Sequence, residues 1–191
     1  MEKFSDDDLE IEVRFIEVNV SELTNKLVLL GARDEGEDSL EEIIFYDKDL
    51  TWQAYGRKFV RIRKTNKGIF VTYKHQAVDS ATGTEEIEFR IENIETMVKF
   101  LERIGLVAYR RQQKKRHKFL LGDVIVDFDT WPKVPTYVEL EGPSEEALKR
   151  AARDLGFDWG KVIFENPRAL IKKYYSIPVE NLRWFTFDRI E

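Results

Sequence analysis

The sequence contains no cysteine and no long uncharged apolar run. The lack of cysteine excludes disulfide bridges, zinc–thiolate sites and cysteine nucleophiles. No segment approaches the roughly 20 apolar residues that a transmembrane helix needs. Residues 1–8 are acidic and polar, without the cationic start and apolar core of a signal peptide. We therefore expect a cytoplasmic protein that has no membrane partner.

An excess of one charge sign is also missing, although charged residues are abundant. The 191 residues include 36 acids and 31 bases, which gives a net charge of −5. This balance provides no overall basic field, so a nucleic-acid partner is not expected. The length fits one domain, and no linker-like segment divides it. We expect a single domain over residues 1–191 that ends in a helical segment, as a monomer or a homodimer.

The alternation of apolar and charged residues is the clearest pattern, and it begins at residues 9–15. Ile11, Val13 and Phe15 point to one side of a predicted strand, and three charged residues, Glu10, Glu12 and Arg14, to the other. Similar patterns predict strands at 43–46, 56–64, 68–76, 85–92, 107–121, 123–129 and 137–141. Helices are predicted after the first strand with Ser21 as the N-cap, after Asn93, at 145–155 and from Pro167. Residues 33–42 are interpreted as an acidic loop.

One face of each predicted strand collects charged residues. The simplest interpretation is an open sheet whose charged face lies in water. Same-face carboxylates two residues apart lie about 7 Å from each other, and they repel by roughly 0.6 kcal/mol in water but about 2.4 kcal/mol at an effective dielectric of 20. The acids are Glu10, Glu12, Glu86, Glu88, Asp127, Asp129, Glu139 and Glu141, and the bases are Arg14, Arg61, Arg63, Lys74, Lys114, Arg116 and Lys118.

A charged barrel interior explains why such pairs recur on four strands. About eight strands are enough to close a barrel, so the pattern favours a small barrel with a charged interior. Carboxylates on one wall would bind Mg²⁺ or Mn²⁺. Arginines and lysines on the other wall would hold a polyphosphate by charge-assisted hydrogen bonds.

The order of these motifs resembles the CYTH superfamily, the triphosphate tunnel metalloenzymes. Glu10-Ile-Glu12-Val-Arg14 is similar to the opening signature Glu-x-Glu-x-Lys, with arginine in place of the lysine. The paired arginines Arg61 and Arg63 and the following Lys74 resemble further family motifs. So do the acidic pair Glu86 and Glu88, the basic pair Lys114 and Arg116, and the late acids Asp129 and Glu139. The resemblance covers approximately residues 8–145.

The resemblance implies an α+β fold, a closed eight-stranded antiparallel β-barrel that forms a tunnel, with helices packed outside. It also implies a role for each charged group. Arg14 keeps the charge of the signature lysine, but an arginine rarely loses its proton, which argues against a role as a base. The resemblance implies catalytic roles for Glu10, Glu12, Arg14 and Lys74. It implies substrate binding by Arg14, Arg61, Arg63, Lys74, Lys114 and Arg116, and metal binding by Glu10, Glu12, Glu86, Glu88, Asp127, Asp129, Glu139 and Glu141.

Three functions are compatible with this interior. The leading prediction is metal-dependent hydrolysis of an inorganic or organic triphosphate. The second is a class IV adenylyl cyclase that makes cyclic AMP and pyrophosphate from ATP in the same tunnel. The third is a non-catalytic module that binds polyphosphate or an RNA 5′ end through the basic wall, although the nearly complete set of acids argues against it.

Overall fold

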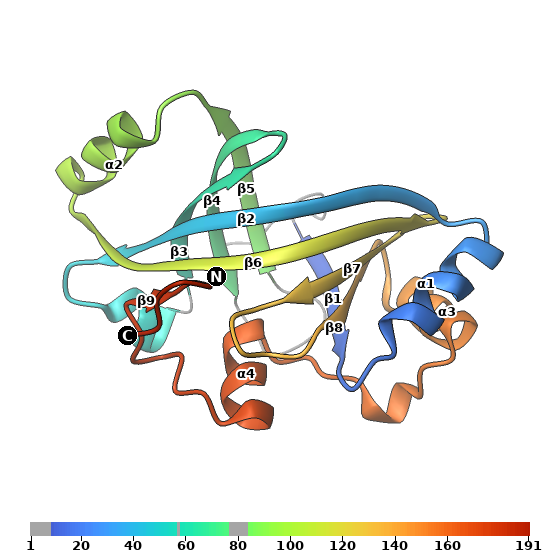
Figure 1. Ribbon diagram of the computed structural model, residues 1–191. Coiled ribbons are helices and arrows are strands. Elements are labelled where there is room, and N and C mark those ends of the chain that lie inside the picture. The colour runs from blue at the N-terminus through green and yellow to red at the C-terminus, as the bar shows by residue number, and fades with distance from the viewer. Residues whose placement is uncertain (1–8, 57, 77–83) are drawn as a thin grey trace.

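The computed structural model describes residues 9–56, 58–76 and 84–191 (Figure 1). The strands of this part of the chain are β1 (Leu9–Phe15), β2 (Arg33–Asp47), β3 (Lys58–Thr65), β4 (Gly68–Gln76), β5 (Thr84–Ile91), β6 (Leu106–Leu121), β7 (Val124–Thr130), β8 (Tyr137–Gly142) and β9 (Trp184–Phe185). The α-helices are α1 (Val20–Leu29), α2 (Ile94–Arg103), α3 (Glu145–Leu155) and α4 (Pro167–Tyr175). Short helical turns lie at Trp52–Gly56 and Trp159–Lys161.

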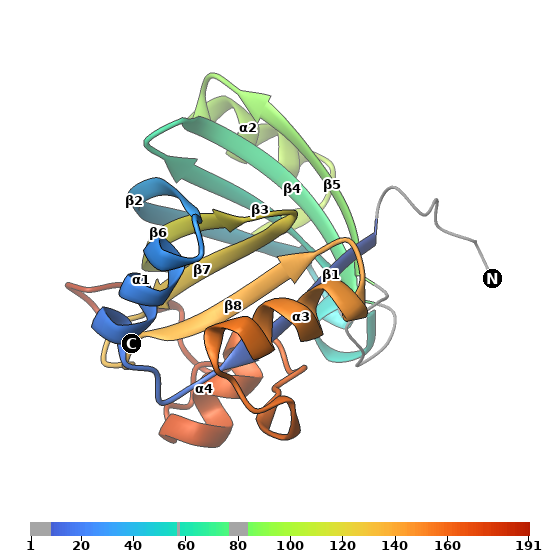
Figure 2. The ribbon, with the colours of Figure 1, turned by 90° about the vertical axis from the view of Figure 1, so that its right-hand side faces the viewer.

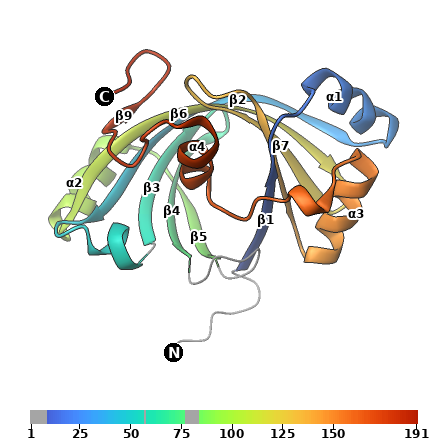
Figure 3. The same ribbon diagram turned by 90° about the horizontal axis from the view of Figure 1, so that it is seen from below.

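The first eight strands form one strongly curled sheet in the order β2-β3-β4-β5-β1-β8-β7-β6, and β2 also pairs with β6. All pairings among these eight strands are antiparallel, whereas the short β9 joins β6 in parallel. Figure 3 shows the strands arching around the interior. Within the described residues, β1 and β5 share two residue pairs, fewer than any other neighbours among these eight strands. The predicted antiparallel sheet with outer helices is therefore confirmed as a curled half-barrel, but full closure is not.

The apolar face of the sheet points outward, and the helices cover it. One core lies between α1, α3 and the outer face of β1, β6, β7 and β8, and includes Val13, Val126 and Leu140, each 0% exposed. A second core lies between α2 and strands β2, β3 and β4. Figure 2 shows α2 and the α1–α3 pair at well-separated parts of the sheet. Burial of apolar side chains on the outer face leaves the alternate, charged side chains on the concave face.

The C-terminal segment is anchored to the sheet rather than hanging from it. Helix α4 packs Leu170 and Ile171 into a third core with Trp131 and Tyr137. Before it, Ile163 forms a β-bridge with Arg14 of β1, with both backbone hydrogen bonds at 2.9–3.0 Å.

None of the helices in the described residues is long and apolar enough to cross a membrane.

Two local predictions were wrong, and both corrections concern residues before β3. Asn19, not Ser21, caps α1, because its side chain accepts a hydrogen bond from the backbone of Glu22. Residues 33–42 are not a loop but the first two thirds of β2, which pairs along its whole length with β6. This acidic segment is extended because it faces the basic β6, where opposite cross-strand charges stabilise pairing.

Candidate functional site

The charged side chains of the concave face divide into two contiguous arcs. The acidic wall, as we define it, consists of strands β5, β1, β8 and β7, which are neighbours in the sheet. The basic wall consists of β6, β2, β3 and β4, which are also neighbours. The acidic wall carries all the predicted acids, and the basic wall carries all the predicted bases except Arg14, which lies within the acidic wall. The basic wall also contains an acid that was not predicted, Glu42.

Arg14 organises the acidic wall. It is 1% exposed, and its guanidinium donates to Glu139 Oε2 at 2.8 Å and lies 2.6 Å from Glu12 Oε1. A third contact runs from Nη1 to the backbone carbonyl of Glu165, at 3.1 Å. Burial by itself would lower the pKa of Arg14, but attraction to Glu12 and Glu139 outweighs it and raises the pKa. Arg14 therefore stays charged and fixes two carboxylates.

The junction of β6 and β7 carries the densest ion-pair network. Arg116 donates to both oxygens of Asp129, at 2.6 and 2.7 Å, and to Glu139 Oε1 at 3.0 Å. Lys114 Nζ donates to Asp129 Oδ2 at 2.7 Å. Burial opposes ionisation of Asp129, yet Arg116 and Lys114 lower its pKa. Burial and the charge of Arg116 lower the pKa of Lys114. The fork geometry of Arg116 on a carboxylate is the geometry that also suits a phosphate.

Glu42 organises the basic wall and was missed by the sequence analysis. It is 3% exposed and lies 2.7 Å from Arg63 Nε, 3.5 Å from Arg61 Nη1 and 2.6 Å from Gln112 Nε2. Burial would raise the pKa of Glu42, but Arg63 and Arg61 lower it. Arg61 Nε is buried without a hydrogen-bond partner among the described residues. One carboxylate thus serves two arginines, and the wall keeps a positive surplus.

The β4–β5 side brings the remaining predicted residues together. Lys74 Nζ lies 2.9 Å from Glu86 Oε2, and Arg61 Nη2 lies 3.5 Å from Glu86 Oε1. Glu88 accepts a hydrogen bond from Thr72 at 2.7 Å. The pair Glu86 and Glu88 therefore faces bases and a hydroxyl rather than the other predicted metal ligands.

The two walls act on each other across the interior. The positive charge of Lys74 on β4 helps to lower the pKa of Glu139 on β8, after larger contributions from burial, which raises it, and from Arg14, which lowers it. Within the basic wall, the charge of Lys114 on β6 also helps to lower the pKa of Glu42 on the neighbouring β2. Charged groups from strands far apart in the sequence therefore share one space.

A cation would fit the acidic wall between β1, β7 and β8. Asp127 is 1% exposed, and neither of its oxygens has a hydrogen-bond partner among the described residues, although Arg116 lies in ion-pair contact. Burial raises the pKa of Asp127. It also raises the pKa of Glu141, with further contributions from Glu139 and Glu12. Glu12 and Glu141 are direct cross-strand partners. Hard oxygen ligands with uncompensated charge are what Mg²⁺ or Mn²⁺ requires.

The arrangement is not a preformed metal cage. Among the described residues, no three acidic or histidine side chains already converge as a set of metal ligands. The side chain of Glu10 lies outside the described part, so its predicted role is untested. Arginine and lysine occupy the carboxylates of Asp129 and Glu139, which a metal would have to share with them. The predicted metal set is thus mostly paired with bases, since Glu12 and Asp127 also contact Arg14 and Arg116, whereas Glu141 forms no ion pair among the described residues.

The C-terminal segment reaches this interior through Arg168 of α4, which the sequence analysis left without a role. Its Nη1 donates to Gln112 Oε1 at 3.3 Å, and its Nη2 is buried without a partner among the described residues. Gln112 shares the parity of Lys114 and Arg116 on β6, which could have identified it as an inward residue. Arg168 gives no such signal, because only the packing of α4 brings it near.

Comparisons with known proteins agree with this geometry. The CYTH domain model matches residues 8–162. A Methanocaldococcus jannaschii protein named "Putative adenylate cyclase" is 26% identical over 134 residues, which are 70% of this chain and 76% of that protein. A solved structure named as a putative adenylate cyclase from Vibrio parahaemolyticus has a TM-score of 0.70, with 14% identity over 86% of this chain and 98% of that one.

A third relative is described by its activity. The structure titled as a putative adenylyl cyclase from Hippeastrum with a dominant triphosphatase activity has a TM-score of 0.61 and 16% identity. The structural match covers 90% of this chain and 98% of the Hippeastrum chain. At these identities, the two solved structures establish a shared fold.

Proposed function

The chain belongs to the CYTH domain family, and from this premise we propose that it is a divalent-metal-dependent triphosphatase acting on inorganic triphosphate or an organic triphosphate. The observation that carries the proposal is the pair of facing walls, one with surplus carboxylate and the other with surplus guanidinium and ammonium. A triphosphate with bound metal carries both charges that these walls lack. A basic site alone would bind the substrate, and an acidic site alone would repel it.

The basic wall would hold the phosphates. Arg61, Arg63 and Lys74 approach from β3 and β4, and Lys114 and Arg116 from β6, so that phosphate oxygens would be contacted from two directions. Arg61 Nε would gain a partner on binding, because it has none among the described residues. We further propose that the curled sheet acts as a closed tunnel when substrate is bound, with the weak β1–β5 junction drawn together.

The acidic wall would hold Mg²⁺ or Mn²⁺ through Glu12, Asp127 and Glu141, with Asp129, Glu139 and Glu10 as further candidates. When bound, such an ion neutralises developing charge on the phosphates and lowers the pKa of a water ligand. Arg14 would position Glu12 and Glu139 for this role, since its guanidinium contacts both. Lys74 would neutralise the negative charge that develops on the leaving phosphate group.

The test is phosphate release from tripolyphosphate with Mg²⁺ or Mn²⁺. We expect turnover by the unchanged protein and its loss in Glu12→Gln, which keeps the shape but removes the charge. Glu41→Gln is the matched control, because Glu41 is 56% exposed and belongs to the outward parity of β2. No release from inorganic or organic triphosphates by the folded, metal-loaded protein would refute the proposal.

Adenylyl cyclase activity is the second candidate, because all three relatives described above are named as putative adenylate or adenylyl cyclases. Cyclic AMP and pyrophosphate formed from ATP with Mn²⁺ would identify it, whereas a triphosphatase releases orthophosphate. A non-catalytic polyphosphate or RNA-end binder would instead bind in a salt-sensitive manner that is indifferent to metal and to loss of Glu139.

A further inference from the structure

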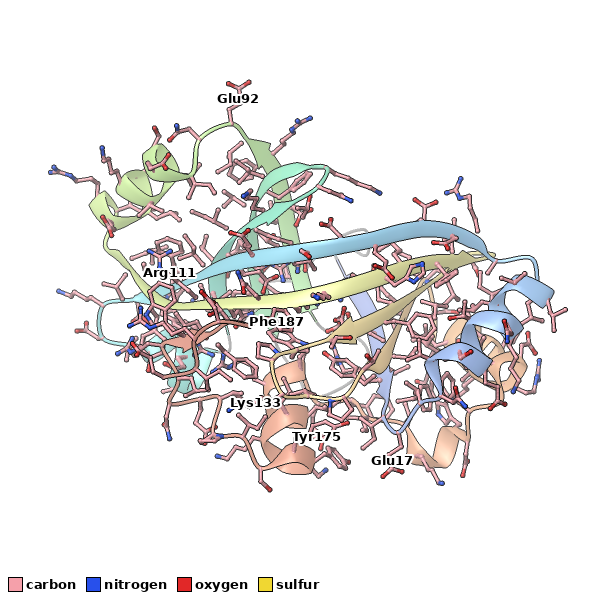
Figure 4. All side chains as sticks on the ribbon, in the orientation of Figure 1. Glu17, Glu92, Arg111, Lys133, Tyr175 and Phe187 are labelled. Atoms are coloured by element: carbon pink, nitrogen blue, oxygen red, sulfur yellow. The ribbon has the colours of Figure 1, made fainter. Side chains whose placement is uncertain are left out.

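A second basic cavity lies at the start of β6, where β9 joins it. Its volume is about 320 Å³, and it is lined by Ala108, Tyr109, Arg110, Arg111, Arg183 and Trp184. We call it the β6–β9 pocket. Arg111, labelled in Figure 4, lies at this end of the sheet, and its backbone amide donates to the carbonyl of Arg183 at 2.8 Å. The pairing of β9 with β6 therefore forms the pocket from two distant parts of the sequence.

The most unusual group in the β6–β9 pocket is the side chain of Arg110. It is 3% exposed, yet its Nε and Nη1 are buried without a hydrogen-bond partner among the described residues. Its guanidinium lies 5.3 Å from the ring centre of Tyr46 and 5.2 Å from that of Tyr109. Aromatic faces attract a cation but cannot accept these hydrogen bonds in the plane of the guanidinium. A buried arginine in this state lacks an anionic partner.

The other charged side chains that line the β6–β9 pocket are also positive. Arg183 stacks 3.6 Å from the ring centre of Tyr109 and donates to its backbone carbonyl at 3.0 Å. Arg111 lies 5.4 Å from the ring centre of Trp184. Within the described part of the chain, none of the three arginines that line the pocket forms an ion pair. Arg189, which also covers Trp184, is already paired with Glu191.

The β6–β9 pocket lies toward the start of β6, away from the Arg116 network, although Arg110 shares the inward parity of Gln112 on that strand. Arg110 precedes Arg116 by six strand positions, which places their backbones roughly 20 Å apart at 3.3 Å per residue. A triphosphate bound between Arg116 and the acidic wall would not reach it. The interior bases are matched by buried carboxylates, whereas this pocket contains none among its lining residues.

We propose that the β6–β9 pocket binds a small phosphate-bearing anion, with Arg110 as its buried anchor and Arg111 and Arg183 at its rim. Guanidinium groups in this number suit phosphate oxygens, which accept several charge-assisted hydrogen bonds at once. The volume lies at the lower end of small-molecule sites, so the ligand is a free phosphate or diphosphate, or a phosphate ester no larger than a mononucleotide. This site is distinct from the proposed hydrolysis site and does not depend on that activity.

The experiment is calorimetric titration of the metal-free protein with pyrophosphate, followed by titration with AMP. We expect two classes of pyrophosphate site in the unchanged protein. Arg110→Met keeps the length and packing of the side chain, and it should weaken one class at least tenfold. Arg183→Gln, at the rim, should weaken the same class about fivefold. Arg63→Gln should weaken only the other class. Tighter binding of AMP than of pyrophosphate at the Arg110-dependent site would identify a phosphate ester as the ligand, and weaker binding would identify a free phosphate.

Arg103→Gln is the matched control, since it removes an exposed arginine at the end of α2 and should change neither class. Circular dichroism establishes that each variant folds, and Arg183→Gln keeps the test valid if Arg110→Met does not. A single class of site, or two classes that both ignore Arg110→Met and Arg183→Gln, would overturn the proposal. Neither result would bear on turnover of tripolyphosphate.

Discussion

The acidic and basic walls of the interior have the same construction, but they lack counter-charges of opposite sign. Each wall is a run of neighbouring strands that carry mostly like charges, and in each a buried residue of the opposite sign, Arg14 or Glu42, contacts two of them. In the acidic wall, Asp127 keeps two oxygens without hydrogen-bond donors among the described residues. In the basic wall, Arg61 keeps a buried Nε without an acceptor there. One wall is therefore short of a cation and the other of an anion.

This difference shows how a fold can tolerate a concentrated charge surface without neutralising it. Full neutralisation would need as many buried partners as there are charges, and would leave nothing for a ligand to satisfy. A single central counter-charge offsets the worst repulsion, because it contacts two like charges at once. The residual imbalance then favours a ligand that carries both signs, such as a metal-bound polyphosphate.

Removal of the counter-charge from the basic wall should have the largest effect. Glu42→Gln leaves Arg63 buried without the carboxylate that it contacts, and leaves Arg61 with the longer contact to Glu86. We expect a loss of about 3–5 kcal/mol in the free energy of unfolding. Urea unfolding measures this loss, and added pyrophosphate should restore part of it by supplying the missing anion. Glu41→Gln on the neighbouring, outward position should cost less than about 0.5 kcal/mol. Equal effects of the two substitutions would contradict the comparison.

The corresponding change in the acidic wall should be smaller. Arg14→Met removes the partner of Glu12 and Glu139, but Glu139 keeps Arg116 at 3.0 Å. We expect a loss of about 2–3 kcal/mol. Here Mn²⁺, and not pyrophosphate, should restore stability, and thermal unfolding with each ligand measures the difference. Arg33→Met, at a side chain that is 70% exposed, is the control. Rescue of both variants by the same ion would show that the two walls do not differ as described.

The sequence predicted the outer architecture and most of the charged interior. Alternation was sufficient because strand parity alone decides which side chains share a face, and residues 9–15 and 68–76 were predicted with the bounds observed. The curvature could not be predicted in full. Closure depends on how many residues pair at the β1–β5 junction, and that number is set by three-dimensional twist rather than by alternation.

The missed residues show where alternation fails as a signal. Glu42 lies in a segment rich in acids, Glu35, Glu37, Asp38, Glu41 and Glu42, where a polar loop and a half-buried strand have the same composition. Its strand is defined by the basic partner β6, which is some 70 residues away. The sequence did not identify Arg110 as an unpaired residue, because a run of basic residues has the same pattern whether or not each one forms an ion pair in the fold.

Acid titration should sharpen the comparison further. Burial opposes the ionised form of Glu42, but Arg63 and Arg61 lower its pKa below that of the unfolded chain. Its contribution to stability is therefore complete above the unfolded pKa and is lost as the pH falls toward the folded pKa. When the pH falls from 7 to 3, the free energy of unfolding of Glu42→Gln should therefore decrease by about 1–2 kcal/mol less than that of the unchanged protein. Parallel stability curves for the two proteins, from urea unfolding at each pH, would contradict this assignment.

The smallest effect on stability is expected at Asp127, and it is the most informative about the cation. Asp127→Asn removes a buried charge whose ionisation is opposed by burial, although Arg116 lies in ion-pair contact with it. The free energy of unfolding without metal should therefore change by less than about 1 kcal/mol, and can increase. Affinity for Mn²⁺, measured by calorimetry, should nevertheless fall at least tenfold if this carboxylate is a ligand. Asp123→Asn, in the turn before β7, should leave that affinity unchanged. A large loss of stability with unchanged Mn²⁺ affinity would mean that Asp127 serves Arg116 alone, and that the acidic wall lacks no cation at this point.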